Sequence, residues 1–158
     1  MINRKAQAAM EFLMTYGWAI LVVLAAIGAL AYFGVLSPDK MLPEKTTFMA
    51  PLANIDNAVV SASGRTIQVV VQNNLGQTVS IANGTTGVSA TADCASVSGF
   101  TAVPNSVPNG EKATLTWTCG GTFTAGSKFK SDLTFTYTNT FSGQNHPHTG
   151  SITAKVSP

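Results

Sequence analysis

The chain has 158 residues, of which 45% are apolar and only 10% are charged, and its formal net charge is +2. This length suits one compact domain with an appendage and is too short for two full domains with a linker. The nine basic residues are scattered along the sequence, unlike the clustered lysines and arginines typical of nucleic-acid-binding proteins. We therefore expect no nucleic-acid partner.

The N-terminal region combines a short basic segment with a long apolar run. Residues 1–11 read MINRKAQAAME, and residues 12–36 then hold 25 positions without a charge. As a helix this run would be roughly 37 Å long, which exceeds the ~30 Å of a bilayer's hydrocarbon core. Pro38 and Pro43 follow in a mixed-charge stretch, so we predict that the helix stops soon after the run and that a joint ends near residue 45.

From residue 46 onward the apolar pattern changes to a period of two. In KATLTWTC, residues 112–119, Leu115, Trp117 and Cys119 alternate with threonines, which is typical of a half-buried strand. The same alternation occurs in residues 65–73, 78–82, 87–94, 131–138 and 150–156. Turn pairs between these segments are Ser63-Gly64, Asn83-Gly84, Asn109-Gly110 and Gly120-Gly121. The predicted fold class is α+β, with a long N-terminal hydrophobic helix followed by an all-β antiparallel head, an immunoglobulin-like sandwich or a small barrel.

The two cysteines, Cys94 and Cys119, both lie in the predicted head. An even number of cysteines in a segment that would be exported predicts a disulfide. Such a bond would close a loop of about 25 residues and contribute roughly 3 kcal/mol. Two buried free thiols are the alternative. Trp117, two residues before Cys119 on the same strand face, is predicted to pack in the core near this bond.

The order of residue types around the start of the apolar run is the most informative feature of the sequence. Residues 4–36 resemble the class III signal peptides of archaeal type IV pilin-like proteins, with the motif on Gln7, Ala8, Ala9, Met10, Glu11 and Phe12. In that family a membrane peptidase cuts between a small residue and the glutamine, so the resemblance implies cleavage between Ala6 and Gln7. Ala6 stands where the family usually has glycine, and Ala9 where serine is frequent.

This resemblance implies a domain organisation and a function. Residues 1–6 would be a leader peptide, residues 7–45 the hydrophobic helix and joint, and residues 46–158 the head. The expected function is that of a structural subunit of a surface filament that polymerises through the helix and serves in adhesion. Its expected partners are copies of itself, the prepilin peptidase, the assembly ATPase with its platform protein, and the cytoplasmic membrane before assembly, where the precursor would hold its head outside.

Cleavage would change the electrostatics of the helix start. It would remove the basic residues that hold the N-terminus inside and create an α-amine on Gln7. Because a lone carboxylate in an apolar fibre core is costly, Glu11 needs a partner, and the α-amine of Gln7 in the same or a neighbouring subunit is the nearest candidate. Gln7, Glu11 and Phe12 are therefore the predicted assembly residues. The alternative for Glu11 is a weak interaction with the helix dipole.

Two other interpretations of the helix remain open. It could be a permanent single-pass anchor that presents a monomeric β-sandwich binding module at the cell surface. Ala29-Leu30-Ala31 also matches the Ala-x-Ala site of an ordinary secretory signal peptide.

The head offers few candidate functional residues. Asn83-Gly84-Thr85 is an N-glycosylation sequon in a predicted turn, which makes Asn83 a candidate glycan site. His146-Pro147-His148 is interpreted as a polar loop, because two histidines alone do not make a metal site. The head's acids, Asp56, Asp93, Glu111 and Asp132, form no recognisable catalytic pair. We therefore expect no enzyme activity, no cofactor and no metal.

Overall fold

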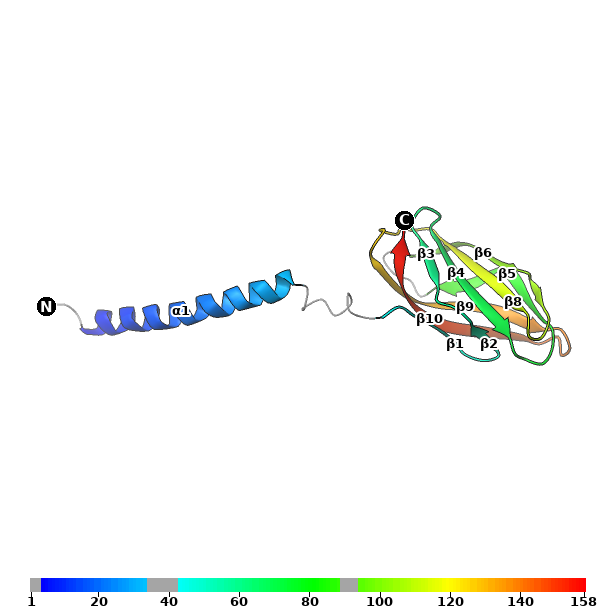
Figure 1. Ribbon diagram of the computed structural model, residues 1–158, viewed down its shortest axis with the longest axis horizontal. Coiled ribbons are helices and arrows are strands. Elements are labelled where there is room, and N and C mark those ends of the chain that lie inside the picture. Colours follow the sequence, from blue (N-terminus) through cyan, green and yellow to red (C-terminus); the bar gives the residue numbers. More distant parts are fainter. Residues whose placement is uncertain (1–3, 34–42, 89–93) are drawn as a thin grey trace. The chain divides into compact units, whose positions relative to one another are not determined.

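The computed structural model describes residues 4–33, 43–88 and 94–158 (Figure 1). The chain divides into two compact units, Met1–Leu42 and Pro43–Pro158. The described part of the first unit is helical, and that of the second consists of β-strands, turns and loops. The fold class is thus the expected one: an N-terminal apolar helix followed by a β-rich head.

Helix α1 spans Arg4–Tyr32 and is followed by a turn at Phe33, whose N–H donates to the carbonyl of Ala29 at 3.0 Å. The helix contains no proline and is rich in alanine, leucine and methionine, which have high helix propensity. It starts within the predicted leader and ends four residues before the end of the charge-free run at Leu36. Residues 34–36 of the run, and Pro38 beyond it, lie outside the described residues.

The head is built from short and long strands. The short strands, of two to four residues, are β1 (Lys45–Phe48), β2 (Leu52–Asn54), β3 (Val59–Ser61) and β7 (Ser106–Val107). The longer ones are β4 (Thr66–Asn73), β5 (Val79–Val88), β6 (Val97–Val103), β8 (Lys112–Cys119), β9 (Lys128–Asn139) and β10 (Asn145–Ser157). The first strand begins at Lys45, one residue before the predicted head.

The strands form one continuous sheet that folds round a single core. The path is β6-β8-β4-β3-β10-β9-β5-β7, with β1 added beside β10 and β2 beside β4. All pairings are antiparallel except that between β10 and β3, where Val156 and Ser157 run parallel to Val60 and Ser61. Strands β5 and β6 approach each other at the opposite side, so the head is a nearly closed barrel of mainly antiparallel strands.

The core is filled from the inward faces of the long strands. In β8 the residues alternate between buried and half-buried, with Leu115, Trp117 and Cys119 inward, as the sequence predicts. In β9, Leu133, Phe135 and Tyr137 are also inward. The rings of Trp117 and Phe135 meet edge to face with centroids 6.3 Å apart, and Phe100 lies 5.0 Å from Trp117. This aromatic cluster ties β6, β8 and β9 together.

Strand β1 is attached to the outer edge of β10 by a close contact. Phe48 is paired with Gly150, and a Cβ atom at Gly150 would overlap the Phe48 ring. The absence of a side chain there lets the phenylalanine reach the core, where it is 3% exposed. On the other side of β1, Asn54 Oδ1 accepts from the Phe48 N–H at 2.8 Å. A short edge strand held in this way offers little open backbone to other chains.

Three local predictions need correction or fall outside the structure. Asn83-Gly84 is not a turn but lies inside β5, where the pairing with β9 shifts between Ile81 and Thr86 and Gly84 has a φ of 93°. His146-Pro147-His148 is not a loop but the first part of β10. Of the predicted strand 87–94, residues 89–93 lie outside the described part.

Candidate assembly helix and associated sites

The surface of α1 is apolar and exposed along its described length. From Gln7 onward every side chain of the helix is exposed, including Leu24 at 62% and Trp18 at 69%. Within Gln7–Tyr32 an 18-residue stretch has a mean hydropathy of 2.1, and this part of the helix is long and apolar enough to cross a membrane. Exposing apolar area to water costs a free energy of about 25 cal/mol per Å², so the helix requires lipid or protein around it.

The predicted cleavage bond lies at the very start of this helix. Ala6 and Gln7 are the third and fourth residues of α1. The first four N–H groups of any helix lack an intrahelical partner, so the first turn opens at little cost. A peptidase that binds an extended substrate could therefore reach the Ala6–Gln7 bond by unwinding one turn.

Gln7 and Glu11 lie on one face of α1, one turn apart. Helical side chains lean toward the N-terminus, which directs the Glu11 side chain toward the turn that contains Gln7. The Thr15 hydroxyl donates to the backbone carbonyl of Glu11 at 3.0 Å. The Glu11 side chain is exposed, so its carboxylate is accessible to a neighbouring α-amine. The geometry is compatible with the predicted pairing in the same or an adjacent subunit.

The third predicted assembly residue, Phe12, belongs to an aromatic pair. Its ring stacks on Tyr16 at the i+4 position, with centroids 4.2 Å apart. Near the middle of the helix the small residues leave the backbone open, because no atom lies within 4 Å of a Cβ built at Gly17 or Gly28. Small residues of this kind let two helices approach closely in an apolar medium.

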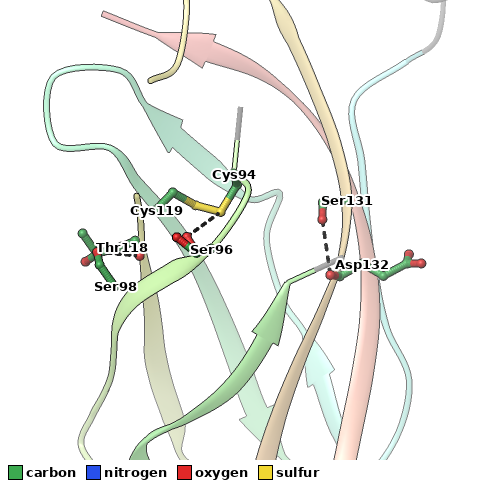
Figure 2. The surroundings of a disulfide bond; sticks show 7 residues. All are labelled: Cys94, Ser96, Ser98, Thr118, Cys119, Ser131 and Asp132. Atoms are coloured by element: carbon green, nitrogen blue, oxygen red, sulfur yellow. Dashed lines mark hydrogen bonds between the residues drawn. A yellow bond between two sulfur atoms is a disulfide. The ribbon is translucent and has the colours of Figure 1, made fainter. Parts of the chain in front are cut away.

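Cys94 and Cys119 form a disulfide, which is the pair predicted from the sequence. Figure 2 shows how the bond joins the end of β8 to the segment before β6. Beside it, Gly120 N–H donates to the Ser96 carbonyl at 2.9 Å, and the Ser98 hydroxyl donates to the Thr118 carbonyl at 3.1 Å. The disulfide therefore reinforces the β6–β8 edge of the head.

The candidate glycan site lies at the seam where the barrel does not close. Asn83 is exposed, and its Oδ1 accepts a hydrogen bond from the Ala102 N–H of β6 at 2.9 Å. Close by, the Ile81 N–H donates to the Asn105 carbonyl at 2.7 Å. Asn83 thus has a structural role that the sequon did not suggest. Because a glycan attaches through Nδ2, the Oδ1 contact is chemically compatible with glycosylation.

His148 is a buried titratable group that the sequence interpretation placed in a polar loop. It is 9% exposed, packs against Phe135, and its Nε2 lies 3.1 Å from the Leu52 carbonyl. Burial lowers the pKa of His148, and backbone hydrogen bonds with Leu52 and Met49 oppose this effect in part. His146 instead stays at the surface beside Tyr137.

The described residues contain an open depression, and they gather no set of metal ligands. The depression has a volume of about 450 Å³ and is lined by Glu44, Gly126, Lys155, Val156, Ser157 and Pro158. Within the described ranges, no three His, Cys, Asp or Glu side chains come together.

No protein-family model matches the chain, and no curated protein sequence matches it. The features that bear on function are the N-terminal motif, the exposed apolar helix and the self-contained head.

Proposed function

We propose that this chain is a structural subunit of an archaeal type IV pilus-like surface filament, with a role in adhesion. The single observation that carries the proposal is the combination of the motif at residues 7–12 with a helix whose described side chains are exposed and almost all apolar. Ordinary secretory signal peptides place their cleavage site after the apolar core, whereas this motif lies before it. The helix is therefore retained after cleavage and can serve as the building element.

The proposed assembly transfers the helix from one apolar medium to another. In the precursor, α1 lies in the cytoplasmic membrane with the head outside, and the peptidase removes residues 1–6. Lipid solvates apolar side chains about as well as protein does, so packing at small residues such as Gly17 and Gly28 can favour the fibre. An assembly ATPase and its platform protein supply the work of extraction.

The head is suited to coat such a fibre because its stability does not depend on the helix. Its core is completed by its own strands, with Trp117, Leu115 and Phe135 fully buried. The β9–β10 hairpin, at the end of β10 remote from Lys45, carries Phe141 with 83% exposure. We propose this hairpin as a candidate contact for adhesion.

The experiment is to shear cells at low salt and to image the released material by electron microscopy. Long polymers that contain this chain are the expected result. Release of single molecules only, or retention of the whole protein in the membrane, would favour a monomeric anchored binding module instead.

A matched pair of variants tests the role of Glu11. Glu11→Ala removes the carboxylate that is proposed to pair with the α-amine, whereas Glu44→Ala removes an exposed acid at the start of the head. We expect filaments to be lost or much reduced with Glu11→Ala and normal with Glu44→Ala. Normal cleavage and normal filaments in Glu11→Ala would contradict the pairing.

A further inference from the structure

Four lysines that are far apart in the sequence come together on one face of the head. Strand β10 lies between β1 and β9 (Figure 1), and Thr153 of β10 is paired with Lys45 on one side and with Lys130 on the other. Two residues further along, Lys155 is paired with Lys128. We call Lys45, Lys128, Lys130 and Lys155 the lysine face.

All four side chains point outward from the barrel. Their neighbours Thr46, Phe129 and Ala154 are buried, so the alternation along each strand directs the lysines to the opposite side. Neighbouring strands lie about 4.8 Å apart, and two residues along a strand span about 6.8 Å. The four Cα atoms therefore lie within about 12 Å of one another. Adjacent members of the group are about 5–8 Å apart, within the Debye length of about 8 Å at physiological salt, so the fields of neighbouring lysines add.

Lys128 and Lys155 are direct cross-strand neighbours, and like charges in that position are destabilising. Two acids lie near the group: Asp132 follows Lys130 on the outward side of β9, and Glu44 precedes Lys45. Lys128 has an interaction of its own, but Lys45, Lys130 and Lys155 alone still outnumber these two carboxylates, so the face carries a net positive charge.

We propose that the lysine face binds the anionic headgroups of the membrane that holds α1, and so docks the head on the bilayer before assembly. Lys45 lies thirteen residues after Tyr32, so the chain between them reaches at most about 45 Å. The lysine face is therefore confined near the bilayer surface whenever α1 spans it, which gives a weak electrostatic contact a high effective concentration. This inference rests on the membrane step of the proposed function.

The experiment uses the full chain inserted through α1 into phosphatidylcholine vesicles with and without phosphatidylglycerol. Acetylation rates of individual lysines, measured by mass spectrometry, report how accessible each amine is. Lys112, which is exposed at the start of β8 and outside the lysine face, is the internal control. We expect Lys45, Lys130 and Lys155 to react about fivefold more slowly with the anionic lipid present, and Lys112 to be unaffected.

Two further arms test the electrostatic cause. Protection should disappear at about 1 M salt, where the Debye length falls to about 3 Å. The double variant Lys130→Glu and Lys155→Glu should remove the protection of Lys45, whereas Lys112→Glu should leave it unchanged. Both sets of variants change exposed positions, and a circular dichroism spectrum checks that the head is folded.

Four results would overturn the proposal. If the protein floats with both vesicle types and its lysines react at equal rates in the two, the docking proposal is contradicted but the membrane step is not. If the protein floats with neither vesicle type, the membrane step is contradicted as well. Stronger protection by duplex DNA in neutral vesicles would make the lysine face a nucleic-acid surface. Equal protection by free glycerol phosphate would reduce it to a phosphate site.

Discussion

The helix and the head are both rich in apolar residues, but they use them in opposite ways. In α1 the described apolar side chains face outward on every side, and none is buried within the chain. In the head they alternate with polar residues, and the inward set is almost completely buried. The head therefore carries its own solvent-free core, whereas the helix depends on its surroundings for one.

This difference predicts where the protein tolerates a charge. On an outward strand position a charged side chain meets water, so its cost is small. On α1 any position between Phe12 and Tyr32 faces lipid before assembly and other helices after it, according to the proposed function. A single charge should therefore have a large effect in one unit and a small one in the other.

The largest expected effect comes from Val23→Asp in the middle of α1. A carboxylate at the centre of a membrane helix costs about 2.5–3.5 kcal/mol of insertion free energy. We expect loss of membrane retention and of filaments, while the unfolding midpoint of the head stays unchanged. The control is Thr101→Asp on the exposed side of β6, which should retain both properties. If Val23→Asp still gave filaments, α1 would not be the assembly element.

The next largest effect concerns the disulfide. Replacing Cys94 and Cys119 together by serine should lower the free energy of unfolding of the head by about 3 kcal/mol, because a loop of 25 residues is no longer closed in the unfolded chain. Urea unfolding followed by tryptophan fluorescence measures the change, and reduction of the wild-type protein should reproduce it. Equal stability in the oxidised and reduced proteins would contradict the account.

A smaller effect is expected from a single methyl group on β10. Gly150→Ala places a Cβ in the space that the Phe48 ring occupies, and such overpacking costs about 1–3 kcal/mol. Gly99→Ala is the matched control, since its Cβ would be 3.9 Å from the nearest atoms of Thr118. Urea unfolding should show a clear loss for the first variant only, and equal values would show that β1 does not need the Gly150 contact.

The smallest effect is the pH dependence contributed by His148. Burial lowers its pKa in the folded head, so its contribution to stability is fully present above the unfolded pKa of about 6.5 and is lost as the pH falls through the folded value. His148→Gln should flatten the stability profile between about pH 7 and pH 5, while His146→Gln should leave it as in the wild type. An unchanged slope in His148→Gln would exclude this residue as the cause.

Sequence alone predicted β4, β8 and β9 because their alternation is strict, but it missed β6. The segment KATLTWTC became β8 with the same bounds, Lys112–Cys119. Strands β1, β2, β3 and β7 have only two to four residues, too few to show a period. His146-Pro147-His148 was interpreted as a polar loop because two histidines alone do not make a metal site, but it lies in β10. Pro147 is tolerated because β1 and β3 pair with β10 only beyond it, so that stretch is a sheet edge.

The candidate sites divide in the same way. The disulfide could be predicted because the chain has only two cysteines, and the structure confirms it. The N-terminal motif is read directly from the sequence, and its roles in cleavage and assembly stay predictions. The lysine face could not, because Lys45, Lys130 and Lys155 become neighbours only through strand pairing. Asn83-Gly84 was misassigned as a turn, because a glycine with positive φ also suits a β-bulge.

The most direct measurement is the intact mass of the protein isolated from its native cells, combined with its size by sedimentation. The account predicts a polypeptide that begins at Gln7 and sediments as a large polymer. A polypeptide that retains Arg4 and Lys5 and sediments as a single molecule would contradict it.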